Sequence, residues 1–450
     1  MKKNDVITLE ITDITADGNG VGRYEGMAVF VPLTAIGDIA KVLILKVKKS
    51  YAYGKIAELL TASENRQLPD CEVYSRCGGC ALRHITYDAE CEFKRNRVEE
   101  CIKRIGGINL SAQPIIRAKS TVHYRNKAQY PICADGRVGF FAVHSHRIIP
   151  CDSCALQPEL FSNVAFEVGE WIREYNVSIY NESDKKGLLR HLYLRYGFAT
   201  DELMAVLVIN GNTLPYSDAL IERLNTRFGE KLKSLQININ REDTNVILGK
   251  ECRVLYGKSY IYDILCGVKI RLSPLSFYQV NREMAQLLYQ KAYEYAKPEG
   301  RIILDLYCGA GTIGLSMANS AEKIIGVEIV EQAVEDARLN AKENGIENAE
   351  FICADATKAA LLLAERKMRP QTVIVDPPRK GCSEQLLCTI ANDFMPERIV
   401  YVSCDPATLA RDVAILGGMN YRLQEYTPVD LFPRTHHVET AALFLRDINS

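Results

Sequence analysis

The sequence predicts an α/β protein whose C-terminal part is a doubly wound, mostly parallel sheet. Strands alternate with helices from about residue 276 onward, short strands rich in β-branched residues fill residues 1–61, and a cysteine cluster lies between these regions. Such alternation is typical of parallel sheets covered by helices. We therefore expect a β-barrel over 1–61, a central α+β domain over 62–275 and an α/β domain over 276–450.

The composition indicates an ordinary globular chain. Its 450 residues are 47% hydrophobic and 25% charged, and the net charge is −1. This balance argues against a polycationic nucleic-acid coat but allows a local basic face. No apolar run follows the N-terminal lysines, and no stretch reaches the ~18 apolar residues of a spanning helix. We expect a cytoplasmic protein without a membrane partner, whose 15 cysteines are mostly reduced.

The first 61 residues predict short antiparallel strands in VITLEITDI, GMAVFVP and AKVLILKVKKSYAYGKIAELL. Turn-rich punctuation between such strands is typical of a small barrel. The stretch GNGVGR lies between strands and no helix opens after it, so it predicts a hairpin rather than a phosphate loop. Tyr51 and Tyr53 beside Lys48 and Lys49 suit stacking on single-stranded nucleic acid, although the tyrosines fit ordinary packing as well.

The central region predicts one clear helix, over about residues 87–106. In TYDAECEFKRNRVEECIKRIGG the apolar residues recur at helical spacing, and Gly106 and Gly107 end the run. We expect this helix to pack on the C-terminal domain. The segments HLYLRYG, ELMAVLVIN and LKSLQININ predict strands. The segment HYRNKAQYP (residues 123–131) interleaves cations with aromatics, which fits either a nucleic-acid contact or strand packing.

A glycine-rich turn follows RIILDL, the first strand of the C-terminal domain. Asp305 lies at the strand end, and Gly309 and Gly311 lead into a helix, so a ligand can approach the backbone there. Glu328 ends the second strand, where an acid suits ribose hydroxyls, and Asp355 ends the third, near an adenine ring. With DPP after the fourth strand, this series resembles the class I fold that binds S-adenosylmethionine better than it resembles a nicotinamide dehydrogenase.

Two later turns carry candidate catalytic groups. Asp376 opens the motif DPPR, in which Arg379 and Lys380 stand where many amine methyltransferases have an aromatic residue. Cys404 lies just past the strand IVYVS, in the polar turn SCDP, and α/β sheets place their chemistry in such turns. The alternative is that Cys404 is one more buried cysteine.

Methylation of uracil at C5 needs a thiol of this kind, because C5 is a poor nucleophile. Addition of a thiolate at C6 makes an enolate with electron density at C5, which attacks a sulfonium methyl group. A base must then remove the C5 proton so that the thiol is expelled. Glu439 in FPRTHHVETAALF is the candidate base, with His436 and His437 as competitors.

DPPRKG, SCDP, HHVET and SFYQVN (residues 276–281) together resemble the RNA (uracil-5-)-methyltransferase family over nearly the whole chain. The bacterial enzymes that make 5-methyluridine in 23S ribosomal RNA are the most similar members. The resemblance implies that Cys404 is the nucleophile, Glu439 the base and Asp376 a uracil contact. It also implies a cofactor site for S-adenosylmethionine made of Gln279, Tyr307, Gly309, Thr312, Glu328, Asp355 and Asp376. Residues 1–61 resemble a TRAM domain, a small barrel of RNA-modifying enzymes.

Five cysteines of the central region are candidate metal ligands. They are Cys71, Cys77 and Cys80 in CEVYSRCGGC, and Cys151 and Cys154 in PCDSCALQ. On spacing alone, an iron–sulfur cluster, a zinc ion and a simple group of reduced thiols are alternatives. The resemblance implies a four-iron, four-sulfur cluster held by Cys71, Cys77, Cys80 and Cys154, with Cys151 as a spare.

The expected activity is methylation of uridine C5 in 23S ribosomal RNA, with RNA as the partner and no obligate protein partner evident. A tRNA T-loop enzyme is the alternative within the same chemistry. Many tRNA-specific relatives lack the cysteine cluster, which favours ribosomal RNA. An RNA exocyclic-amine methyltransferase and a noncatalytic RNA-binding protein are the alternatives of other classes.

Overall fold

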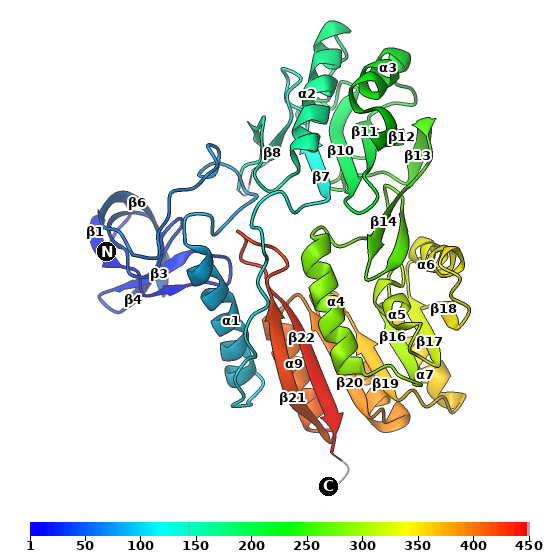
Figure 1. Ribbon diagram of the computed structural model, residues 1–450. Coiled ribbons are helices and arrows are strands. Elements are labelled where there is room, and N and C mark those ends of the chain that lie inside the picture. Colours follow the sequence, from blue (N-terminus) through cyan, green and yellow to red (C-terminus); the bar gives the residue numbers. More distant parts are fainter. Residues whose placement is uncertain (144, 448–450) are drawn as a thin grey trace.

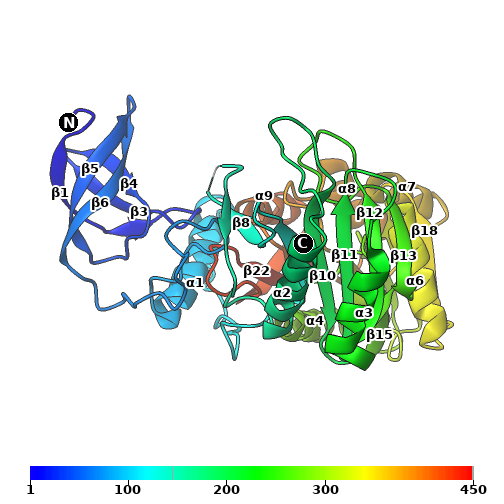
Figure 2. The same cartoon turned by 90° about the horizontal axis from the view of Figure 1, so that it is seen from above.

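The computed structural model describes residues 1–143 and 145–447, which form three parts along the chain (Figure 1). A β-barrel is followed by a part built on a five-stranded sheet and then by a part built on a seven-stranded sheet. The barrel stands to one side of the other two parts, which lie one over the other (Figure 2). In the described residues, no helix combines the length and apolarity that crossing a membrane requires.

The N-terminal sheet closes into a barrel. Its strands, in spatial order, are β1 (Val6–Glu10), β5 (Ile39–Val47), β6 (Tyr51–Thr61), β4 (Met27–Val31), β3 (Gly20–Tyr24) and β2 (Asp13–Ile14). β1 pairs with β5 at one end of this order, and β2 pairs with β3 at the other. Thr12, which lies between β1 and β2, donates its N–H to the oxygen of Val21 at 2.8 Å, so this continuous segment joins the two ends and closes the barrel. Leu9, Val29 and Val42 fill the interior. The hairpin predicted at GNGVGR is confirmed as the β2–β3 pair.

Helix α1 (Tyr87–Arg104) matches the predicted helix and ends two residues before its expected limit. Thr86 caps it by accepting the N–H of Ala89, and Gly107 follows with a φ of +69°. Val98 and Ile102 are buried in the core of the C-terminal part, against α9 (Pro406–Gly417). The expected packing of this helix on the C-terminal domain is therefore confirmed.

The middle part is a sheet with helices on one face. Its strands, in spatial order, are β13 (Glu251–Gly257), β12 (Leu232–Ile239), β11 (Glu202–Ile209), β10 (Leu189–Gly197) and β7 (Lys127–Pro131). The helices are α2 (Glu159–Glu174), α3 (Ser217–Phe228) and the one-turn η1 (Gly229–Lys231). Trp171 of α2 and Leu224 of α3 pack on Leu207 of β11 in one core.

The other face of this sheet shares a core with the C-terminal part, because Met204 and Val206 lie in the same buried cluster as Leu288. Two hairpins complete the middle part. They are β8 (Gly139–Phe141) with β9 (Ile148–Pro150), and β14 (Ile261–Leu265) with β15 (Val268–Leu272). The segment 276–281 runs between the two parts, since Asn126 donates its N–H to the oxygen of Val280 at 2.8 Å.

The C-terminal sheet is doubly wound. Its strands, in spatial order, are β18 (Ala349–Cys353), β17 (Lys323–Glu328), β16 (Ile302–Leu306), β19 (Thr372–Val375), β20 (Arg398–Ser403), β22 (Glu439–Arg446) and β21 (Tyr421–Val429). The first five run parallel, and β22 runs antiparallel to both β20 and β21. The order reverses between β16 and β19, and α/β sheets bind ligands at such a switch point. The predicted fold class is confirmed.

Helices cover both faces of this sheet. One face carries α4 (Arg282–Ala296), α5 (Thr312–Met317) and α6 (Glu331–Glu343). The other carries α7 (Ala356–Glu365), α8 (Glu384–Cys388), the π-helical η2 (Thr389–Phe394), α9 and α1. The edge at which the parallel strands end, called the carboxyl edge below, stays free of these helices and faces the middle part (Figure 1).

Candidate functional site

The glycine turn after β16 is open to a ligand. Tyr307, Gly309 and Gly311 have φ values of +66°, +55° and +78°, so the chain turns through three left-handed residues. A Cβ atom built on Gly309 would meet no atom within 4 Å, whereas one on Gly311 would lie 3.0 Å from Phe351. The turn therefore packs on the sheet at Gly311 and leaves free space beside the backbone at Gly309.

Two acids lie beside this turn at the ends of neighbouring strands. Glu328 accepts the N–H of Gly309 at 3.1 Å and the N–H of Val330 at 2.8 Å, one on each carboxylate oxygen. Asp355 caps α7 through one oxygen, which accepts the N–H groups of Thr357 and Lys358 at 3.1 Å. The structure thus brings Glu328, Asp355 and the turn together at the carboxyl edge, as the sequence predicts.

Asp305 is a buried acid beneath the turn. One carboxylate oxygen accepts the N–H of Gly314 at 3.0 Å, and the other has no partner among the described residues. Burial raises the pKa of Asp305 to about 7. The hydrogen bond from the Gly314 N–H lowers this pKa, and the nearby Asp376 raises it further. A buried oxygen without a partner is unfavourable, and a cationic ligand group would satisfy it.

Helix α4 adds an aromatic residue that the sequence motifs do not identify. Thr312 donates its hydroxyl to the phenol oxygen of Tyr289 at 3.3 Å. Burial, with a smaller contribution from Asp376, raises the pKa of Tyr289. Only the fold brings α4 to this point. Gln279 precedes α4, and its main-chain oxygen accepts the Asn126 side-chain amide at 2.8 Å, which ties it to the middle part.

Cys404 and Glu439 meet because two strands run in opposite directions. Ser403, the last residue of β20, pairs with Thr440 of β22. The residue after β20 and the first residue of β22 are therefore neighbours. Burial, then Glu439 and Asp376, raise the pKa of Cys404 to about 11, while Arg379 opposes them.

Glu439 itself is buried, with 5% of its surface exposed. Burial and the neighbouring Asp376 raise the pKa of Glu439 well above its ordinary value, and Arg379 again opposes. Burial alone raises the pKa of Asp376 to about 7. A thiol, two carboxyls and one guanidinium therefore share this site. Arg379 was not among the predicted site residues, although its place after Pro-Pro in DPPR marks it.

Hydrogen bonds of Ser403 and Asp405 hold the turn that carries Cys404. Asp405 caps α9 by accepting the N–H groups of Ala407 at 3.0 Å and Thr408 at 2.9 Å. Ser403 donates its hydroxyl to the Asp405 oxygen at 3.0 Å and accepts the Asp405 N–H at 3.2 Å. The thiol lies just before the N-terminus of a 12-residue helix, whose dipole favours a thiolate. The helix dipole and Arg379 favour the thiolate form of Cys404, whereas the carboxyls of Glu439 and Asp376 raise the pKa of the thiol.

The two histidines are weaker candidates for the base. The His436 and His437 rings lie 4.1 Å apart between centroids. Burial, His436 and Arg379 lower the pKa of His437 to about 4, and burial also lowers the pKa of His436. Both are neutral and poorly basic near pH 7. Glu439 has the raised pKa and the place opposite Cys404, so the geometry favours Glu439 as the base.

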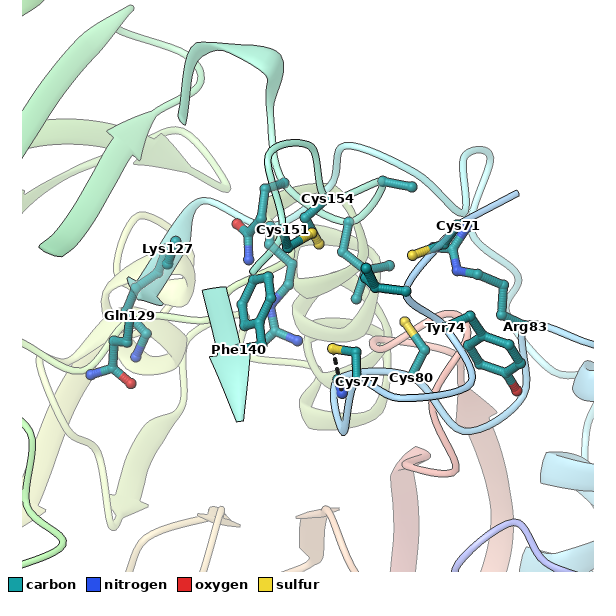
Figure 3. A pocket seen from close by; sticks show the side chains of 17 residues that line it. Cys71, Tyr74, Cys77, Cys80, Arg83, Lys127, Gln129, Phe140, Cys151 and Cys154 are labelled. Atoms are coloured by element: carbon teal, nitrogen blue, oxygen red, sulfur yellow. Dashed lines mark hydrogen bonds between the residues drawn. The ribbon is translucent and has the colours of Figure 1, made fainter. Parts of the chain in front are cut away.

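The five cysteines of the central region line one cavity of about 240 Å³. Figure 3 shows the thiols of Cys71, Cys77 and Cys80 facing those of Cys151 and Cys154 across a common space. Burial and the neighbouring thiols raise the pKa of Cys151 to about 12. Among residues 1–143 and 145–447, no three Cys, His, Asp or Glu side chains are placed to hold a metal ion. The predicted convergence of the cysteines is confirmed, and the metal stays a prediction.

Comparisons with known proteins find similar sequences along nearly the whole chain. The tRNA (Uracil-5-)-methyltransferase family profile matches residues 86–447, and the TRAM domain profile matches residues 2–57. A Clostridium tetani protein described as an uncharacterized RNA methyltransferase is 43% identical over 447 residues, 98% of this chain and 97% of that protein. A protein of Halalkalibacterium halodurans with the same description is 42% identical over 448 residues, again 98% and 97%.

A solved structure is similar over the same length. It is the crystal structure of Pyrococcus abyssi tRNA (uracil-54, C5)-methyltransferase in complex with S-adenosyl-L-homocysteine. It superposes with a TM-score of 0.79 at 30% identity, covering 97% of this chain and 99% of that one. The likeness extends through the barrel, the middle part and the C-terminal sheet.

The raised pKa of Asp376 predicts a pH-dependent cost to folding. Because its folded value of about 7 exceeds the unfolded value of about 3.9, its contribution to stability is present at low pH and is lost as pH rises through about 7. Asp376→Asn removes this loss. In denaturant unfolding of the cofactor-free protein, the variant should gain stability over the parent between about pH 5 and pH 8. Glu365→Gln removes an exposed carboxyl and controls for the lost charge. If the free energy of unfolding of Asp376→Asn varied with pH in parallel with that of the parent, the raised pKa of Asp376 would be contradicted.

Proposed function

The chain belongs to the tRNA (uracil-5-)-methyltransferase family, and from this premise we propose that it methylates C5 of a uridine in 23S ribosomal RNA. It is an RNA methyltransferase of that family, with an N-terminal TRAM domain and a class I methyltransferase fold. The observation that carries the proposal is the group formed by Cys404, Glu439 and Asp376. A nucleophilic thiol and a buried carboxyl base are what C5 methylation requires.

The residues at the carboxyl edge fit S-adenosylmethionine. The open space at Gly309 accepts a ligand against the backbone, and Glu328 and Asp355 suit the ribose and adenine. The unpartnered oxygen of Asp305 suits the ammonium group of the methionine portion. The homologous Pyrococcus enzyme was crystallised with S-adenosyl-L-homocysteine, which supports the same site here. Gln279, Tyr307 and Thr312 complete it in our proposal.

In the proposed reaction, Cys404 adds to C6 as a thiolate, and the C5=C6 electrons move into an enolate. Arg379 and the N-terminus of α9 favour the thiolate, and the thiol proton leaves to solvent or to a neighbouring carboxylate. S-adenosylmethionine, when bound, supplies the methyl group as an electrophilic sulfonium. C5 takes that methyl group, S-adenosyl-L-homocysteine would be the leaving group, and Glu439 as its carboxylate then removes the C5 proton. The C5=C6 bond re-forms, the S–C6 bond breaks and the thiolate returns.

We further propose that the cysteine cavity holds a [4Fe–4S] cluster through Cys71, Cys77, Cys80 and Cys154. The donor set is chemically suitable, because these thiols face one cavity. A single zinc ion is the alternative occupant, and it would need four of these thiols about 2.3 Å from one centre. A cluster of several irons spaces its ligands further apart.

The substrate assignment rests on this cavity together with the resemblance, which implies that the cysteine cluster is more typical of the ribosomal RNA enzymes than of the tRNA enzymes. The likeness to a tRNA (uracil-54, C5)-methyltransferase favours a tRNA T-loop as the second candidate. An exocyclic-amine acceptor is disfavoured, because amine methylation needs neither Cys404 nor Glu439.

The two catalytic groups act at different steps, so their variants should differ in kind. With RNA tritiated at uracil C5, Cys404→Ala should abolish both methyl transfer and tritium release. Glu439→Gln should slow tritium release about 10²-fold or more while a methylated protein–RNA adduct accumulates and survives denaturation. Gel mobility and tritium release measure both effects. Methyl transfer by the Cys404→Ala protein without tritium release would instead favour amine chemistry.

Anaerobic purification tests the metal. The protein should contain about four irons and four sulfides per chain and absorb near ~400 nm. Cys154→Ser should lose this absorption, and Cys151→Ser should keep it. One zinc ion per chain in place of iron would overturn the cluster. Loss of iron in Cys151→Ser but not in Cys154→Ser would overturn Cys154 as the fourth ligand.

The substrate can be decided by competition. The protein is given S-adenosylmethionine with a labelled methyl group and equal amounts of 23S ribosomal RNA and tRNA, both made without base modification. We expect the label only in the ribosomal RNA, as 5-methyluridine. Mass spectrometry of nuclease digests locates it. Label confined to the tRNA T-loop would replace ribosomal RNA with the second candidate.

A further inference from the structure

The connection between β21 and β22 delivers the candidate base. Val429 pairs with Glu439 at the open end of the two strands, so residues 430–438, called the base loop here, lead directly into Glu439. Strand pairing sets the backbone of Glu439, and these nine residues outside the sheet border its carboxyl on the chain side that enters β22.

The base loop is held by groups from other parts of the chain. Main-chain oxygens of the loop accept hydrogen bonds from three side chains of distant segments. These are Asn281 to Leu431 at 3.0 Å, Tyr124 to Pro433 at 2.9 Å and Arg97 to His436 at 2.8 Å. The N–H groups of Ala81 and Leu82 also donate to the oxygen of Arg434, at 3.0 and 3.1 Å.

Lys94 of α1 is at the centre of this arrangement. Its ammonium donates to Glu90 at 2.7 Å, to Asp430 at 2.6 Å and to the main-chain oxygen of Phe432 at 3.1 Å. All three ammonium protons are therefore used, two of them on the base loop. The side chains of Lys94, Glu90 and Asp430 are completely buried.

Two further residues complete the network. Tyr87 donates its hydroxyl to the second oxygen of Asp430 at 2.7 Å and accepts the N–H of Ala118 at 2.8 Å. Arg434 of the base loop donates its N–H to Glu90 at 2.7 Å, and its guanidinium lies 3.5 Å from the same carboxylate. Two cations and two anions thus balance in a buried site shared by α1 and the base loop.

The charge on Lys94 is essential to this balance. Burial alone would lower the pKa of Lys94, but Glu90 and Asp430 outweigh it and raise that pKa. Removing one partner of a buried ion network leaves uncompensated charge, which is strongly destabilising. Moving Asp430 toward water, or protonating its carboxylate, would relieve that state and alter the hydrogen bonds of the base loop, at whose far end Glu439 lies.

We propose that Lys94 is a positioning residue for proton abstraction, which fixes Glu439 against C5 by holding Asp430 and Phe432. The inference rests on the proposed function, because it assigns Glu439 as the base. Lys94 touches neither Cys404 nor the glycine turn in this arrangement, so thiol addition and methyl transfer do not depend on it. Only the last chemical step does.

The test separates the steps in the full-length protein with RNA tritiated at uracil C5. Lys94→Met should form the adduct and transfer methyl within about threefold of the parent rate, but release tritium roughly tenfold or more slowly. The methylated adduct should accumulate as in Glu439→Gln. Tyr87→Phe, which removes one hydrogen bond to Asp430, should show the same split more weakly, and it carries the test if Lys94→Met does not fold.

Arg190→Met is the matched control. Arg190 is a buried cation of the middle part, whose hydrogen bonds go to Asn240 and Glu242. It should lose stability without separating tritium release from methyl transfer. Equal slowing of all steps in Lys94→Met and Tyr87→Phe, or unchanged tritium release, overturns the positioning role. If Glu439→Gln accumulates no adduct, the proposed base fails instead.

Discussion

The antiparallel pairing of β22 with β20 brings the candidate catalytic groups of this protein together. In an all-parallel sheet the residue before a strand lies at the amino edge, far from the residues that follow the other strands. Because β22 runs the opposite way, its first residue reaches the carboxyl edge beside the end of β20. Glu439 thereby joins Cys404 and Asp376, and the glycine turn after β16 lies at the same edge. The remaining parts of the structure orient these groups.

The first 130 residues contribute to that orientation. Helix α1 packs on α9 and supplies the buried cation that holds the base loop. Directly after Cys80, Ala81 and Leu82 bond to Arg434 of the same loop. The segment that follows the cysteine cavity therefore also contacts the base loop, so the cavity and the ion network are joined through residues 80–82.

The features predicted well from sequence are those encoded locally. An apolar strand followed by glycines or by SCDP predicts that the turn lies at the carboxyl edge. The helical spacing of apolar residues predicts α1. Tyr289 and Lys94 escaped prediction because their surroundings come from segments far away in sequence: α4 beside the glycine turn, and the base loop across α1. The spacing of the cysteines predicted their convergence but could not separate Cys151 from Cys154, since both line the cavity.

Covalent addition of Cys404 to C6 of the target uridine is the step on which the proposed function depends. Substrate RNA containing 5-fluorouridine tests it directly, because fluorine at C5 cannot be removed as a proton and the adduct cannot break down. After incubation with S-adenosylmethionine and protease digestion, mass spectrometry should find the methylated fluorouridine on the peptide that contains Cys404. A crosslink to another cysteine, or turnover without any crosslink, would contradict the account.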